Sequence, residues 1–219
     1  MARVVVTGAA GTIGSVLMNG LDGHELTGLD LPDCDLRTAD LRPLFRRRDV
    51  VVHLAWNTTT EYAFQHSFDP DNTAMTHRVY EAAAAAGVRR VIMASSVHAD
   101  RYASWEGPGT LAPDAVPWPD SPYGAGKVMM ESLGRYYAAH RGLEVVCLRF
   151  GGMSPVDEWP DDPALRPTWL RHDDCVDVVR RAIEVDEIPA RFAVLYAVSD
   201  GSEPVVDLTN PIGWRPRPH

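Results

Sequence analysis

The chain has few cysteines and no excess of positive charge. Its 219 residues include only three cysteines, Cys34, Cys147 and Cys175. They are widely spaced and lack a CxxC or Cys/His ligand pattern, so the sequence predicts neither a disulfide framework nor a zinc site, and we expect no metal. With 30 acidic and 21 basic residues, the formal net charge is −9. That charge disfavours nucleic acid and anionic membranes as partners.

The chain also lacks a long apolar run and a cleavable leader. No stretch approaches the ~18 consecutive apolar residues that cross a bilayer. Met1 leads at once into the strand-like segment Arg3–Thr7, without a cationic and apolar leader. We therefore expect a cytoplasmic protein that uses no membrane and acts on a small molecule. The length predicts a single domain over residues 1–219 with a sizeable core.

Six short apolar runs bounded by turn residues recur along the chain. They cover Arg3–Thr7, Glu25–Asp30, Val50–Ala55, Val91–Ala94, Glu144–Phe150 and Phe192–Val198. Helical segments separate them, of which Asn72–Ala86 ends at Gly87 and Tyr123–His140 is closed by Gly142. This alternation predicts an α/β fold with a Rossmann-like, doubly wound parallel sheet. Such sheets bind ligands at the carboxyl ends of their strands.

A glycine-rich turn follows the first predicted strand directly. Gly8 permits a sharp turn, Gly11 lets backbone N–H groups approach a pyrophosphate, and Gly14 lets the next helix pack closely on its strand. Thr12 and Ile13 fall at the start of that helix, whose positive end then faces the phosphates. A merely tight turn is the alternative. The flanking apolar strand favours a dinucleotide site formed by these five residues.

Asp30 stands at the end of the second predicted strand. A carboxylate there can accept hydrogen bonds from both hydroxyls of the adenosine ribose and would repel a 2′-phosphate. The sequence therefore predicts NAD rather than NADP as the cofactor. A solvated acid at a strand end is the alternative, and Arg37, a few residues later, can soften the discrimination.

Ser96, Tyr123 and Lys127 form the predicted catalytic set. Ser96 closes the fourth predicted strand, and Tyr123 opens a helix four residues before Lys127, so one helical turn places phenol and ammonium on the same face. An adjacent ammonium lowers the pKa of a tyrosine from about 10 and lets it act as a base. We predict that Tyr123 removes the substrate's proton and that Ser96 holds the substrate oxygen. Taken singly, each residue also has an ordinary structural interpretation.

The ordered set of motifs resembles the extended short-chain dehydrogenase/reductase superfamily, which contains the NAD-dependent epimerases and dehydratases. The similarity covers residues 3–216 and rests on TGAAGTIG at 7–14, Asp30, CDL at 34–36, HLAW at 53–56, Asn72, ASS at 94–96, SPYGAGK at 121–127 and GWRP at 213–216. It implies that the cofactor also contacts Asp35, Leu36, Leu54, Ala55, Tyr123 and Lys127. Asn72 would stand behind the site or cap its own helix, and the residues leave both interpretations open.

Three details move the resemblance toward NAD-dependent uronate dehydrogenases. Residues 95–98, Ser-Ser-Val-His, resemble the Ser-Ser-Asn-His pattern of that family. Residues 165–174 resemble its carboxylate-binding segment, in which the Arg166 guanidinium can donate two parallel hydrogen bonds to a carboxylate. The region after Gly151 is short for a pocket that grips a nucleotide. The implied reaction is the NAD-dependent oxidation of a free hexuronate at its anomeric carbon to an aldarolactone.

The substrate site that this resemblance implies consists of Thr58, Ser96, His98 and Arg166. Its elements are expected mainly from residues 151–191, a small and partly irregular region rich in Pro, Trp and Asp. His98 as a strand-end histidine and Arg166 as a surface arginine are the structural alternatives.

The sequence leaves other substrates open. Relatives act as epimerases or dehydratases of nucleotide sugars, or as dehydrogenases of sugar phosphates and neutral aldoses. A member that binds NAD without turnover is disfavoured because Tyr123 and Lys127 are both present. Val97 stands where the related pattern has an amide side chain, which loosens the substrate assignment.

Two other departures concern the fold. The link at residues 31–34 is short, so we expect a trimmed sheet edge. The chain stops at His219, where relatives continue into a further helix, so we expect its stability or assembly to differ. By the same resemblance the helices at 72–86 and 123–140 would form a homodimer or higher homo-oligomer. The alternative is that their alanines pack only on the sheet.

Overall fold

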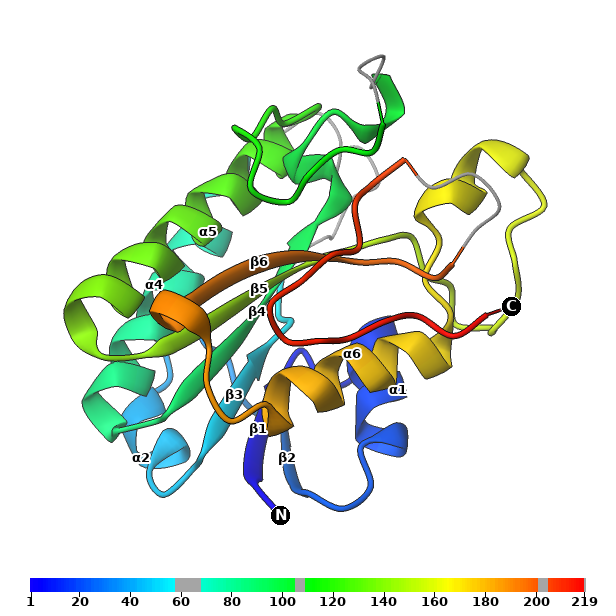
Figure 1. The fold of residues 1–219 in the computed structure, drawn as a ribbon. Helices are drawn as coiled ribbons and strands as arrows, with labels where there is room; N and C mark the ends of the chain where they lie inside the picture. The colour runs from blue at the N-terminus through cyan, green and yellow to red at the C-terminus, as the bar shows by residue number, and fades with distance from the viewer. Residues whose placement is uncertain (58–67, 105–108, 201–204, 219) are drawn as a thin grey trace.

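The structure is a computed structural model that describes residues 1–57, 68–104, 109–200 and 205–218. Six parallel strands form one sheet in the order β2-β1-β3-β4-β5-β6 (Figure 1). They are β1 (Arg3–Thr7), β2 (Glu25–Leu29), β3 (Val50–His53), β4 (Arg90–Ser96), β5 (Glu144–Phe150) and β6 (Phe192–Ala197). The predicted Rossmann-like parallel sheet is confirmed, and each strand lies where its apolar run predicted it.

The sheet ends at β2 on one side, as the short link predicted. β2 pairs only with β1 among the described strands. The residues that follow β2 form turns rather than a further strand, and the next helix is the short α2 (Leu41–Phe45).

Helices cover both faces of the sheet (Figure 1). α1 (Thr12–Gly20) and α6 (His172–Glu184) pack together on one face. α2, α4 (Pro70–Ala86) and α5 (Pro122–Arg141) form the layer on the other. Of the helices within the described ranges, none has both the length and the apolar character needed to span a membrane.

Alternation along the strands divides the core into two parts. Val4 and Val6 of β1 pack with the α1 and α6 side, whereas Val5 between them packs with the α4 and α5 side. Successive side chains of a strand point to opposite faces, so a strand covered by helices on both sides must be apolar throughout. This is why β1 reads as an unbroken apolar run.

The two long helices begin and end at recognisable signals. α4 starts two residues before the predicted Asn72 because the Asp69 carboxylate accepts a hydrogen bond from the Asp71 N–H at 2.9 Å. α5 starts after Ser121, whose hydroxyl accepts from the Gly124 N–H at 3.1 Å. Both end at a glycine in the left-handed region. The capping of α5 fixes where its first turn meets the sheet.

Short 3-10 helices follow the strands at the carboxyl edge of the sheet. η1 (Val97–Ala99) and η2 (Tyr102–Ser104) follow β4, and η3 (Pro163–Thr168) follows β5. A fourth, η4 (Pro189–Arg191), precedes β6. The described residues after β6 return along α6 (Figure 1), where Arg217 pairs with Asp177 at 2.7 Å.

A buried ion pair closes the amino end of the sheet. Arg90 of β4 is fully buried and donates to the Glu144 carboxylate of β5 at 2.9 and 2.6 Å. Its remaining donor reaches the carbonyl oxygens of Ala182 and Ile183 at 2.6 and 3.1 Å. Arg90 thus satisfies carbonyls at the end of α6 that the helix itself leaves without partners.

Removal of one partner of this pair should destabilise the fold. In Glu144→Gln the Arg90 guanidinium stays buried without its counter-charge, so we expect the free energy of unfolding to fall by about 3 kcal/mol in urea denaturation. Glu25→Gln is the control, because Glu25 pairs with Arg48 while 56% exposed, and exposed pairs contribute less than about 1 kcal/mol. Equal losses in the two variants would contradict this assignment.

Candidate active site

The turn between β1 and α1 has no room for side chains at two of its glycines. A Cβ atom on Gly8, where φ is +72°, would lie 2.7 Å from the Ala55 amide nitrogen. A Cβ on Gly14 would lie 2.1 Å from the Gly8 carbonyl oxygen. Gly11 is the N-cap of α1, and no side chain caps its first N–H groups. These donors and the tight backbone fit a pyrophosphate.

Two cavities meet at this turn. Their volumes are about 520 and 470 Å³, and both are lined by Gly8, Gly11, Leu54 and Trp56. The first also contacts Asp30, Asp35, Leu36 and Ala55. The second also contacts Thr12, Ile13, Gly14, Ser96, His98, Tyr123 and Lys127. Every residue predicted to bind the cofactor therefore lines one of these two adjoining cavities, which together form a groove. We call the part beside β2 the adenosine half and the part beside β4 the nicotinamide half, after the cofactor groups that the sequence predicts there.

Asp30 is fixed at the wall of the adenosine half. One carboxylate oxygen accepts from the Ala10 N–H at 2.7 Å and the other from the Leu31 N–H at 2.8 Å. Its predicted contact with ribose hydroxyls stays a prediction. Asp35 forms a two-pronged pair with Arg37 at 2.9 and 2.8 Å, which lowers the pKa of Asp35 to about 2. Arg37 is thereby engaged by a carboxylate.

The structure brings Ser96 and Tyr123 together. Ser96 is the last residue of β4, Tyr123 lies in the first turn of α5, and both line the nicotinamide half of the groove. The Trp56 and His98 rings pack edge-on against Tyr123, with centroids 5.7 and 5.9 Å away. The phenol is therefore held between two rings at the mouth of the nicotinamide half.

Lys127 is the only lysine in the chain. Its side chain is buried, and Nζ donates to the Ala94 carbonyl oxygen at 2.8 Å. Nζ also lies 3.8 Å from the Trp56 ring centroid and 5.5 Å from that of Tyr123. Burial lowers the pKa of Lys127 to about 7, while the charge of Glu131 acts in the opposite direction. The ammonium is thus balanced between its two protonation states near neutral pH.

The predicted lowering of the Tyr123 pKa is wrong for this arrangement. Burial raises the pKa of Tyr123 to about 12, and the hydrogen bond with Ser96 opposes that rise. The reason is geometric, since the Lys127 ammonium is directed to the Ala94 carbonyl and the Trp56 ring. Desolvation of the phenol therefore outweighs the neighbouring charge.

Three side chains that the sequence analysis did not single out complete the site. They are Trp56, Tyr102 and Asp120. The Asp120 carboxylate pairs with His98 Nδ1 at 2.9 Å, and the Tyr102 ring lies 5.6 Å from the His98 ring. Trp56 is the last residue of the HLAW motif, and Asp120 directly precedes SPYGAGK. Their position in or beside these motifs was the sequence signal that could have identified them. Asp120 and His98 are 22 residues apart, a spacing that predicts no contact.

Asn72 is not the cap of its helix, because Asp69 has that role. The Asn72 side-chain oxygen accepts from the Asn57 N–H at 2.6 Å, and its Nδ2 donates to the Asn57 carbonyl at 3.2 Å. Asn72 therefore holds the segment that leaves β3 along the groove. Of the two interpretations left open, the position behind the site is the one found.

The structure does not bring Arg166 into the groove. Arg166 lies in η3, is exposed, and donates to the Pro160 carbonyl at 3.3 Å. Its neighbours Leu165 and Thr168 do line the nicotinamide half. Thr58 lies outside the described residues. The substrate roles of Arg166 and Thr58 stay predictions.

Comparison with known proteins gives the family. Residues 4–154 match the NAD dependent epimerase/dehydratase family. The chain is 36% identical, over 99% of its length and 97% of the relative, to an L-arabinose 1-dehydrogenase (NAD(P)(+)) of Haloferax volcanii. It is 32% identical, over 90% of its length and 76% of the relative, to a uronate dehydrogenase of Pseudomonas putida. A crystal structure of uronate dehydrogenase from Agrobacterium tumefaciens superposes with a TM-score of 0.81 at 26% identity, over 100% of this chain and 85% of that one.

The parallel sheet, the glycine turn and the Ser96, Tyr123 and Lys127 set define an NAD-dependent dehydrogenase. The chain belongs to the NAD dependent epimerase/dehydratase family. The resemblance that the motifs indicated is confirmed, and NAD is the cofactor.

The glycine turn gives a direct test of the cofactor site. In Gly14→Ala the new methyl group would meet the Gly8 carbonyl oxygen at 2.1 Å, so the turn must shift, and we expect the Kd for NAD to rise at least about tenfold in calorimetric titration. Asn19→Ala, an exposed position on the same helix, is the matched control and should leave the Kd unchanged. A folded Gly14→Ala protein with unaltered affinity would refute this reading of the turn.

Proposed function

We propose that the protein oxidises a free sugar at its anomeric carbon with NAD and releases the lactone. The observation that carries this proposal is that Ser96, Tyr123 and Lys127 share the wall of the 470 Å³ cavity that adjoins the glycine turn, with Lys127 Nζ 5.5 Å from the Tyr123 ring centroid. This is the arrangement in which an alcohol loses a proton to a positioned phenol next to a dinucleotide.

NAD supplies the hydride acceptor when it is bound. Ser96 is placed to hydrogen-bond the anomeric hydroxyl oxygen, and Tyr123 to take the proton from that hydroxyl. The hydrogen on the anomeric carbon leaves with its electron pair, and a C=O bond forms in its place. The positive charge of Lys127 favours the phenolate form of Tyr123 that the proton transfer needs. The ring oxygen stays attached, so the oxidised product is a lactone.

We further propose a neutral aldose as the preferred substrate. Among the described residues, the side chains lining the nicotinamide half include Lys127 and His98 but no arginine. Residues 58–67, 105–108 and 201–204 contain neither arginine nor lysine. His98 Nδ1 is paired with the Asp120 carboxylate at 2.9 Å. The described wall thus offers no arginine fork to a carboxylate or phosphate.

The relatives support two substrate classes. The L-arabinose 1-dehydrogenase is named for a neutral aldose, whereas the uronate dehydrogenases are named for sugar acids. The hexuronate predicted from the sequence would require Arg166 to leave the Pro160 carbonyl and turn into the cavity. Sugar phosphates and nucleotide sugars would need still more positive charge than this wall supplies.

A substrate panel separates these classes. With NAD and equal concentrations of L-arabinose and other neutral aldoses, galacturonate, glucuronate, glucose 6-phosphate and UDP-sugars, we expect NADH formation with a kcat/KM at least about tenfold higher for a neutral aldose than for a hexuronate. Arg166→Ala should change the aldose value by less than about twofold. A hexuronate preference that Arg166→Ala abolishes would instead establish the substrate predicted from the sequence.

Tyr123 gives the test of the mechanism. Tyr123→Phe removes the proton acceptor and keeps the ring between Trp56 and His98, so we expect kcat to fall at least about 100-fold with folding intact by circular dichroism. Tyr136→Phe, at an exposed position of the same helix, is the matched control and should retain full activity. Retained turnover in Tyr123→Phe would exclude the phenol as the base.

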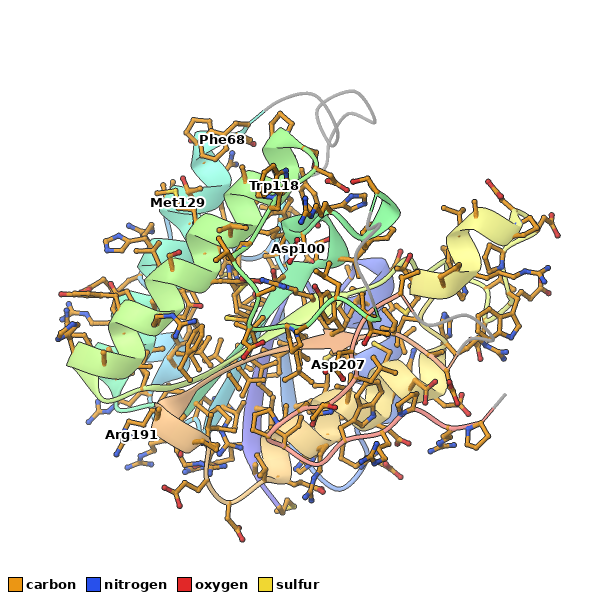
Figure 2. The ribbon with its side chains drawn as sticks, turned by 45° about the horizontal axis from the view of Figure 1, so that its top comes forward. Phe68, Asp100, Trp118, Met129, Arg191 and Asp207 are labelled. Carbon is orange, nitrogen blue, oxygen red and sulfur yellow. The ribbon has the colours of Figure 1, made fainter. Side chains whose placement is uncertain are left out.

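The homodimer or higher homo-oligomer that the resemblance implied stays a prediction. The surface of the α4 and α5 layer exposes Met129 and Tyr136 of α5 by 48% and 50%, and Phe68, next to α4, by 47%. Figure 2 shows Phe68 and Met129 on the outer side of this layer. An exposed apolar surface of this kind supports contact with a second copy of the chain.

A further inference from the structure

A row of buried polar side chains crosses the sheet beneath the catalytic residues. Ser95 of β4, Arg149 of β5 and Tyr196 of β6 are register partners, so they project from the same face. Glu131 of α5 covers them, and all four are at most 5% exposed. The mechanism derived above uses none of these residues.

Hydrogen bonds tie this row together. The Glu131 carboxylate accepts from Ser95 Oγ at 2.5 Å and from two nitrogens of Arg149 at 2.9 and 3.0 Å. Arg149 also donates to the Tyr196 hydroxyl at 3.1 Å and lies 3.5 Å from the Asp100 carboxylate. Asp100, labelled in Figure 2, is buried just after η1. One arginine thus sits between two carboxylates.

Glu131 and Lys127 are neighbours on α5. Tyr123, Lys127 and Glu131 follow one another at four-residue intervals, so they share one face of the helix. The Ser95 hydroxyl that bonds Glu131 and the Ala94 carbonyl that accepts from Lys127 belong to adjacent residues of β4. The strand therefore holds the acid and the ammonium close together.

The charges of this buried group balance only if Lys127 is included. Arg149 is one cation, and Glu131 and Asp100 are two carboxylates, which leaves one negative charge. The Lys127 ammonium supplies the missing positive charge. A buried ion without a counter-charge is strongly unfavourable, and the negative charge of Glu131 favours the ammonium form of Lys127.

Other titratable groups around Lys127 do not replace this balance. His53 of β3 is buried and its pKa is lowered to about 3, so it is neutral at pH 7. His98 of η1 is paired with Asp120. Lys127 Nζ also faces the Trp56 ring and the phenol of Tyr123. Glu131 is the carboxylate whose charge acts on Lys127.

We propose that Glu131 is a positioning residue of the dehydrogenase: its buried carboxylate keeps the Lys127 ammonium charged beside Tyr123. The proposal depends on the NAD-dependent dehydrogenase reaction and not on which sugar is oxidised. A lysine is charged below its pKa and neutral above it, and a nearby carboxylate raises that pKa. Without Glu131 the ammonium should lose its proton at a lower pH. Turnover, which needs the charged form, should then fall at the same lower pH.

Competitive acetylation measures this protonation without turnover. Acetic anhydride modifies only neutral amines, and Lys127 is the only lysine, so mass spectrometry can follow its labelling against the α-amine of Met1 as internal reference. We expect half-maximal labelling of Lys127 near pH 7 in the natural protein, as its pKa of about 7 implies. In Glu131→Gln the midpoint should fall by about one pH unit.

Glu144→Gln is the matched control. It makes the same substitution in the same kind of buried arginine pair, at the opposite end of the same two strands, β4 and β5. We expect both variants to lower the melting temperature and only Glu131→Gln to move the Lys127 midpoint. If both leave the midpoint unchanged, Glu131 has a purely structural role and the proposal is overturned.

The pH dependence of turnover gives the second readout. With whichever sugar is oxidised, the alkaline limb of the kcat/KM profile should move about one unit to lower pH in Glu131→Gln, and Glu131→Asp should restore it in part. Arg149 keeps Asp100 as counter-charge in Glu131→Gln. If Glu131→Gln is not recovered folded, the double variant Glu131→Gln/Arg149→Gln removes both members of the ion pair at once. An unchanged labelling midpoint of Lys127 in this double variant would overturn the proposal. Absence of any sugar turnover would refute the proposed function while leaving the labelling result intact.

Discussion

Burial of one ammonium group organises the active site. Lys127 is buried below the carboxyl ends of the strands. The Ala94 carbonyl, the Trp56 ring and the charge of Glu131 take the place of its hydrating water there. The contacts that achieve this also fix α5 against β4. Gly124, in the first turn of α5, allows this helix to pack closely on the segment after β4, because a Cβ there would lie 1.9 Å from the His98 carbonyl oxygen. Phenol, serine and histidine are therefore placed by the same packing that desolvates the lysine.

Desolvation also explains why the pKa values of Lys127 and Tyr123 shift in opposite directions. Burial moves the pKa of the Lys127 ammonium down and that of the Tyr123 phenol up, since it penalises the charged form of each. A site that excludes water also strengthens every charge interaction within it. The protonation of both groups therefore depends on the surrounding charges, which include the buried group of Glu131, Arg149 and Asp100. Arg90 and Glu144 form a similar buried pair at the other end of the sheet. There the arginine binds a carbonyl oxygen at the end of α6.

Much of the fold and the centre of the site followed from local patterns. The six strands, the glycine turn and the Ser96, Tyr123 and Lys127 set depend on residue type and spacing within one strand, turn or helix. The rest depended on contacts between segments far apart in sequence. Asp120 meets His98 across a loop, Asn72 holds Asn57, and Arg166 is drawn to Pro160 on the outside of η3. Spacing along the chain contains no information about such pairs.

The sequence by itself determined the parallel sheet, the dinucleotide turn and the choice of Ser96, Tyr123 and Lys127 as candidates for proton transfer, because apolar periodicity and short motifs act within a few residues of backbone. Only the tertiary structure decided the direction in which the pKa values of Tyr123 and Lys127 shift, the contacts of Asn72 and the charged side chains that line the described part of the nicotinamide half. Those properties come from desolvation and from distances between elements. Both are set when the helices close over the sheet and cannot be read from any single segment.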